Sequence, residues 1–92
     1  MESLISPHKC CYVCGTTMNL HKHHVYGGTG RRQISDREGC WCWLCGYHHN
    51  LSNAGVHRNH ALDIRIKREC QEAWEAGRSR EEFIRTFGRS YL

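Results

Sequence analysis

A chain of 92 residues, 39% of them hydrophobic, has too little apolar material for a large core, which excludes a multidomain protein. No stretch approaches the roughly 18 consecutive apolar residues of a membrane helix, and the N-terminal MESLISPHKC lacks the apolar run of a secretion signal. The net charge of +4 is carried mainly by arginine, which favours a partner rich in phosphate.

So small a core needs additional cross-links, and the chain offers seven cysteines and eight histidines for them. An odd number of cysteines, interleaved with histidines and without an export signal, favours bound metal over disulfide bonds. We therefore expect a cytoplasmic, metal-binding protein that does not associate with a membrane.

Two short runs in the middle of the chain read as strands, residues 20–26 and 40–45. Residues 27–39 between them are rich in glycine and show no hydrophobic period, which predicts a loop. This loop carries three of the arginines. They are Arg31, Arg32 and Arg37.

The rest of the chain, residues 61–92, is predicted to be helical. From Ala61 apolar residues recur every three or four positions, and Gly77 is expected to end this helix. Its apolar face is predicted to comprise Leu62, Ile66, Cys70, Ala73 and Trp74. A capping box from Ser79 to Glu82 then opens a second helix that Gly88 ends. The apolar side of this second helix is predicted to consist of Phe83, Ile84 and Phe87.

The strongest motif is a pair of short-spaced cysteines, Cys11 and Cys14, because two intervening residues let both thiolates turn toward one zinc ion. A tetrahedral site needs two further ligands from a second hairpin. Cys45 and His48 are one choice, and Cys42 with Cys45 is the alternative. We favour Cys45 and His48, because Cys42 lies in mid-strand, where the chain is not expected to turn. The remaining cysteines, Cys10, Cys40 and Cys70, need no chemical role. Cys70 is expected to be a small apolar residue on the inner face of the helix, and Cys40 is expected to pack within its strand.

A second group of histidines needs a separate explanation. His23 and His24 are adjacent on a predicted strand, so their side chains point to opposite faces and cannot both bind one ion comfortably. One of them can hold an ion while the other faces a substrate. That arrangement suits metal-assisted hydrolysis of a phosphodiester, in which a neutral imidazole takes a proton from water. His8, His21 and His60 are expected to be incidental.

Taken together, these motifs resemble the HNH, or ββα-metal, endonuclease superfamily. The matching pieces are the Cys11-x2-Cys14 knuckle, LHKHHV at 20–25, the glycine-rich segment, LCGYHHN at 44–50 and a following helix. More narrowly, CGYHHNLSNAGVHRNHALD and REEFIRTFGRSYL resemble small HNH proteins of phages and prophages. The similarity extends from Cys10 to Leu92.

The resemblance implies an α+β fold: a β-hairpin and a helix that grip one divalent ion, braced by a structural zinc site and followed by a C-terminal helix. Residues 1–92 would form a single nuclease domain. Residues 10–60 would hold the zinc knuckle and the metal core, and residues 61–92 the helical part.

The resemblance also implies roles for individual residues. His23, His49 and His57 would bind the catalytic ion, which is Mg²⁺, Mn²⁺ or another divalent ion, and His24 would be the general base. The family has an asparagine that holds the hairpin loop about five residues before the second zinc pair, and this chain has Cys40 there. Asn50 follows His49 but occupies a different place in the pattern.

The implied activity is a metal-dependent endonuclease that nicks or cleaves DNA in a bacterial host cell. Besides DNA, a recombination or packaging protein is an expected partner. Arginines are the candidates for contacts to DNA phosphates, which position a duplex without reading its sequence. They are Arg31, Arg32, Arg37 and Arg58, with Arg65 and Arg68 on the long helix. The alternative is a non-catalytic zinc module that binds nucleic acid or a protein partner.

Overall fold

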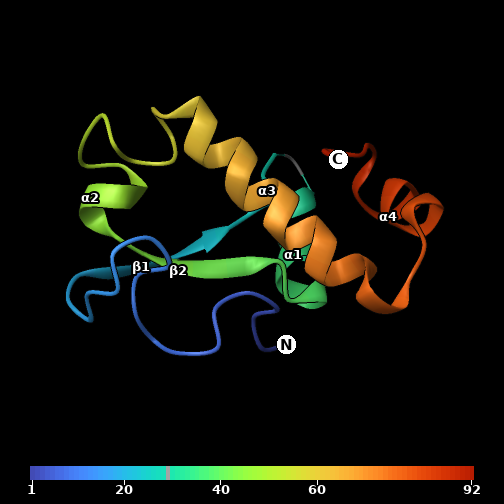
Figure 1. The fold of residues 1–92 in the computed structure, drawn as a ribbon, viewed down its shortest axis with the longest axis horizontal. Helices are drawn as coiled ribbons and strands as arrows, with labels where there is room; N and C mark the ends of the chain where they lie inside the picture. Colours follow the sequence, from blue (N-terminus) through green and yellow to red (C-terminus); the bar gives the residue numbers. More distant parts are fainter. Residues whose placement is uncertain (29) are drawn as a thin grey trace.

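The computed structural model describes residues 1–28 and 30–92 (Figure 1). Two strands, β1 (Leu20–His24) and β2 (Trp41–Cys45), pair in antiparallel fashion. The helices are α1 (Arg31–Glu38), α2 (Gly46–His49), α3 (His60–Trp74) and α4 (Arg80–Phe87), with a 3-10 turn, η1 (Glu75–Gly77), after α3. The fold is therefore α+β, as predicted. None of the helices in the described residues is long and apolar enough to cross a bilayer.

The hairpin has two chemically different faces. Residues that pair across antiparallel strands share a face, and His23 pairs with Cys42 while His24 pairs with Trp41. One face therefore carries His21 and His23 beside Cys42 and Leu44. The other face carries Lys22 and His24 beside Trp41 and Trp43. Figure 1 shows α3 crossing one side of the hairpin, while the N-terminal segment curves around the other.

The core joins the inner face of the hairpin to the C-terminal helices. Cys42 and Leu44 are fully buried, and they belong to one apolar cluster with residues of α3 and α4. The predicted stripe on α3 is confirmed for Leu62, Ile66, Cys70 and Trp74, which are all buried.

The last helix begins and ends where the sequence predicts, but one of the three residues predicted for its apolar side is exposed. Both hydrogen bonds of the capping box between Ser79 and Glu82 are present, and Gly88 ends α4 in a left-handed conformation. Phe83 and Phe87 are buried, whereas Ile84 is 41% exposed. The prediction for Ile84 is wrong because residues four apart share a helix face, and the next residue lies about 100° around the helix.

The prediction of a loop at 27–39 is also wrong, because eight of its residues form α1. Gly30 and Gly39 bound the helix with φ values of 79° and 76°, a region that glycine enters without strain. Thr29, which belongs to the predicted loop, lies outside the described residues. Helix α1 shows no repeating apolar stripe, so a search for hydrophobic period does not detect it.

Tertiary hydrogen bonds, rather than an apolar stripe, fix the position of α1. Ser35 is fully buried; its hydroxyl accepts a hydrogen bond from the Tyr26 backbone N–H at 3.1 Å and donates one to the Tyr26 carbonyl at 2.9 Å. The Arg31 guanidinium donates to the carbonyl of Phe87 at the end of α4. These contacts tie α1 to the chain that leaves β1 and to the C-terminal helix.

Strand β1 ends two residues earlier than predicted, and strand β2 begins one residue later. After His24, the Val25 N–H bonds to the Cys40 carbonyl at 3.0 Å, and the Tyr26 backbone turns to Ser35. Val25 and Tyr26 are buried in the core after the strand has ended. Their backbone N–H groups bond to Cys40 and Ser35, which lie outside the sheet, and so connect β1 to α1.

Ser35→Ala should lower the free energy of unfolding by about 1–3 kcal/mol, because it leaves two buried backbone groups of Tyr26 without their partner. Urea denaturation monitored by circular dichroism measures this change. Thr17→Ala, which removes an exposed hydroxyl, is the matched control and should change stability by less than about 0.5 kcal/mol. Equal stability of the two variants would contradict a structural role for Ser35.

Candidate metal centres

Four of the predicted zinc ligands meet at one end of the hairpin. The donor atoms of Cys11, Cys14, Cys45 and His48 all lie within 4.8 Å of one another. The Sγ atoms of Cys14 and Cys45 are 3.8 Å apart, and His48 Nδ1 lies 3.4 Å from Cys45 Sγ and 3.8 Å from Cys11 Sγ. This group, called the knuckle cluster below, is positioned to hold a metal ion.

Local backbone geometry explains how the knuckle cluster forms. Gly15, with φ of 80°, turns the chain after Cys14, and its N–H bonds to the Cys11 carbonyl at 2.9 Å. Burial acts to raise the pKa of Cys11, but backbone N–H groups near its sulfur oppose this and lower the pKa to about 6. The thiolate, which is the form that binds metal, is thus favoured at neutral pH.

Cys42 is not part of the knuckle cluster. Because it lies three positions before Cys45 on a strand, its side chain points to the opposite face of the hairpin. Cys42 is fully buried, and burial raises the pKa of its thiol. Cys40 and Cys70 are likewise fully buried, whereas Cys10 is partly exposed.

A second group of donors comprises His23 from β1, His49 from α2 and His57 from the segment before α3. Their donor atoms also lie within 4.8 Å of one another, and the Nε2 atoms of His49 and His57 are 3.1 Å apart. The ring centroid of His23 lies 5.5 Å from the ring centroid of His49 and 5.5 Å from that of His57. This three-histidine cluster contains all three residues predicted to bind the catalytic ion.

The burial of His23 tests whether this cluster suits a metal. His23 is 6% exposed, and its buried Nε2 has no hydrogen-bond partner within residues 1–28 and 30–92. Burial, followed by the neighbouring His49 and His57, lowers the pKa of His23 to about 3, so the ring is neutral at physiological pH. A buried nitrogen without a partner costs about 1–3 kcal/mol, and a metal ion among the three rings would use its lone pair.

The two clusters share one turn of helix. His48 and His49 are consecutive in α2, where adjacent side chains diverge by about 100°, so one reaches the knuckle cluster and the other the three-histidine cluster. The chain then returns so that the His57 N–H bonds to the His49 carbonyl at 3.3 Å. A Cβ at Gly55 would lie 2.8 Å from that carbonyl oxygen, so the return requires glycine at this position.

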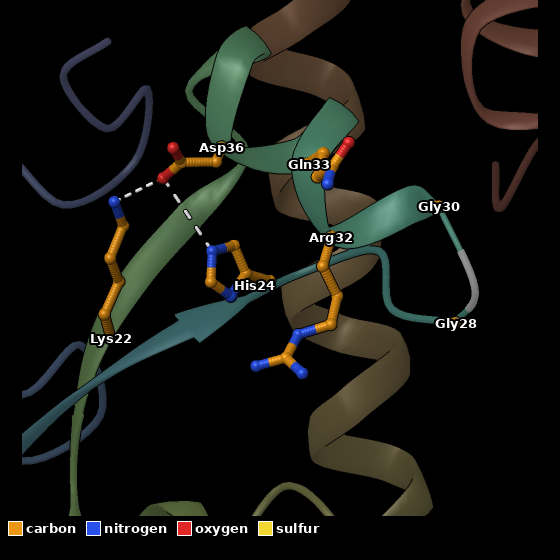
Figure 2. Close-up of a pocket in the computed structure, with 7 residues that line it drawn as sticks. All are labelled: Lys22, His24, Gly28, Gly30, Arg32, Gln33 and Asp36. Atoms are coloured by element: carbon orange, nitrogen blue, oxygen red, sulfur yellow. Dashed lines mark hydrogen bonds and ion pairs between the residues drawn. The ribbon is translucent and has the colours of Figure 1, made fainter.

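His24 lies on the opposite face of β1 from His23, as predicted, and it faces Asp36 of α1. Its Nε2 is 3.7 Å from Asp36 Oδ1, the oxygen to which Lys22 also donates (Figure 2). Figure 2 shows Nδ1 on the other edge of the ring, on the side of the Arg32 guanidinium. Burial and then Arg32 lower the pKa of His24, while Asp36 opposes them.

His24 and the three-histidine cluster open into a single cleft. It has a volume of about 340 Å³ and is lined by His23, His24, His49 and His57, with Lys22, Gly27, Gly28 and Arg32. The cleft therefore brings together three nitrogen donors, one further imidazole and two cations.

The predicted phosphate-binding arginines are dispersed. Arg32 lines the cleft, whereas Arg31 is bound to the Phe87 carbonyl and Arg37 lies 3.3 Å from Glu38. Arg58 is exposed next to His57. On α3, Arg65 pairs with Glu69 at 3.6 Å, and Arg68 donates to the Tyr91 carbonyl at 3.0 Å.

Sequence reasoning missed two neighbours of these clusters. His21, predicted to be incidental, has its Nδ1 2.9 Å from His49 Nδ1. Asp36 faces His24 from a helix that was predicted to be a loop. Strand alternation is the signal for His21, because a residue two positions before His23 shares its face. Asp36 has no comparable signal.

No family model, curated protein or solved structure matches this chain. The two clusters and the cleft are therefore the features that indicate a function.

The protein should bind one metal ion at each cluster, because each supplies three or four donors within 4.8 Å. After equilibration with Zn²⁺ and removal of free metal, mass spectrometry of the native protein should show two bound ions. His49→Ala should lose one ion, and Cys14→Ala should lose the knuckle ion and, because that ion is expected to hold the fold, the second ion as well. His8→Ala, which changes an exposed histidine outside both clusters, should lose none. Unchanged stoichiometry in the first two variants would contradict metal binding at these sites.

Proposed function

We propose that this protein is a metal-dependent endonuclease of the HNH type that hydrolyses phosphodiester bonds in DNA. The observation that carries the proposal is the three-histidine cluster with His24 beside it in one cleft. A structural metal site has no use for a neutral, partly exposed imidazole next to the donors. The order of knuckle, hairpin and helix along the chain supports the HNH assignment within the α+β fold.

We assign the knuckle cluster to a structural zinc ion. Zinc bond lengths of about 2.3 Å to sulfur and about 2.0 Å to nitrogen give tetrahedral edges of about 3.8 Å and about 3.5 Å. The Cys14–Cys45 distance of 3.8 Å and the Cys45–His48 distance of 3.4 Å agree with these edges. Three thiolates and one imidazole leave no position for a substrate, which is typical of a structural site.

The three-histidine cluster would hold the catalytic divalent ion through His23, His49 and His57. Imidazole donors suit transition ions better than Mg²⁺, which prefers oxygen ligands. Mn²⁺ is therefore expected to support more activity than Mg²⁺. When bound, the ion would supply Lewis-acid stabilisation of charge on the scissile phosphate.

His24 would be the general base. The Asp36 carboxylate at 3.7 Å favours a proton on Nε2, which leaves the Nδ1 lone pair free to take a proton from the attacking water. Since the pKa of His24 lies below its ordinary value, the ring is neutral at physiological pH and can accept that proton. Arg32 and Lys22 line the same cleft and would bind phosphate oxygens.

Removal of the knuckle ion should unfold the protein, because metal-binding free energy contributes to folding free energy in a core this small. We expect a strong chelator to abolish the helical circular dichroism signal and added Zn²⁺ to restore it. His49→Ala keeps the knuckle cluster and should unfold over the same range of chelator concentration. A chain that stays folded after its metal has been removed would exclude a structural role for the knuckle ion.

His24→Ala should lower the rate of plasmid nicking in Mn²⁺ by about 10²–10⁴-fold, the usual contribution of a general base. Circular dichroism should show an intact fold, and His8→Ala should nick at the wild-type rate. If His24→Ala nicks normally, His24 is not the base. A wild-type protein that binds plasmid DNA but does not nick it with any divalent ion would instead support a non-catalytic zinc module.

A further inference from the structure

The ring of His49 has partners on both of its nitrogen atoms. Its Nε2 lies 3.1 Å from His57 Nε2, within the three-histidine cluster, and its Nδ1 lies 2.9 Å from His21 Nδ1. The two rings meet edge to face, with centroids 5.0 Å apart and an interplanar angle of 85°. His21 therefore contacts the edge of the His49 ring that faces away from the cluster.

The chemistry of imidazole determines which atom carries the proton. A neutral ring that gives its Nε2 lone pair to a metal ion carries its proton on Nδ1. The His49 Nδ1–H then points at His21 Nδ1, which must accept this hydrogen bond and so keeps its own proton on Nε2. A hydrogen bond to the far nitrogen is the usual way in which a metal-binding histidine is held in one tautomer and one ring orientation.

The backbone gives His21 this position. His21 and His23 are two residues apart on β1, so both side chains project from the same face of the hairpin toward α2. One strand thus supplies His23 as a donor and His21 as a contact to a second donor. His21 itself is not among the three residues whose donor atoms converge.

We infer that His21 is a positioning residue for the catalytic ion: it accepts a hydrogen bond from His49 Nδ1–H and so holds Nε2 of His49 toward the ion. The inference rests on the proposed ion site in the three-histidine cluster. It gives this chain a second contact for His49, which lies in the four-residue helix α2.

The test compares two substitutions at the same position. In His21→Asn the side-chain oxygen can take the place of Nδ1 and accept the hydrogen bond. In His21→Leu the side chain branches at the same carbon as that of asparagine but has no acceptor. Binding of Mn²⁺ is measured by titration calorimetry on protein that has been given one equivalent of Zn²⁺, which the three thiolates of the knuckle cluster bind in preference to the histidines. We expect His21→Leu to bind Mn²⁺ about 10–100-fold more weakly than wild type, and His21→Asn to recover most of that loss.

Controls separate positioning from a general structural effect. Both variants should retain the knuckle Zn²⁺, because His21 is not one of the knuckle ligands. Without Mn²⁺ they should also keep the wild-type melting temperature, because the side chain of His21 is only partly buried. Equal affinities in wild type and His21→Leu would overturn the inference, and so would an equal loss in both variants. The latter result would mean that the imidazole itself, rather than an acceptor at this position, is required.

Metal affinity also separates this inference from the proposed activity. If the affinities follow the expected order but the wild type does not nick DNA, His21 keeps its positioning role and the nuclease proposal fails. If the wild type binds no second ion, both are overturned.

Discussion

The whole candidate site depends on one turn of helix, α2, which directs consecutive histidines to two different clusters. His48 turns toward the cysteines of the N-terminal segment, and His49 turns toward His23 and His57. Neither cluster can shift far without moving the other, because the two imidazoles share one stretch of backbone. A chain with a small apolar core can in this way use the knuckle cluster to hold the cleft in shape.

The hairpin adds a second constraint of the same kind. Strand alternation sends His21 and His23 to one face and His24 to the other, so the proposed metal ligand His23 and the proposed base His24 are adjacent without competing for one ion. Helix α1 closes this arrangement: Ser35 holds the backbone of Tyr26, two residues after His24, and Asp36 faces the His24 ring. Cys40, which directly precedes β2, is buried in the core.

Local patterns predicted most of the secondary structure and the grouping of the donors. Alternation located both strands, the capping box located α4, and the short spacings grouped Cys11 with Cys14 and Cys45 with His48. Prediction failed where tertiary contacts replace local signals. Helix α1 has no apolar period that could reveal it. It is held by the buried hydrogen bonds of Ser35 and by a contact from Arg31 to α4, and these replace a hydrophobic stripe.

The sequence alone determined which donors exist and which of them can point the same way, because spacing on a strand or a turn fixes the direction of a side chain before any packing occurs. Only the tertiary structure decided which distant donors meet. The return of the chain at Gly55 brings His57 to His49, and the packing of α1 against β1 brings Asp36 to His24. Both contacts depend on the way in which successive elements fold back on one another, and no local pattern encodes this. Strand alternation places His21 on the same face as His23, but only the tertiary structure brings it to His49 and so makes it a neighbour of the proposed ion site.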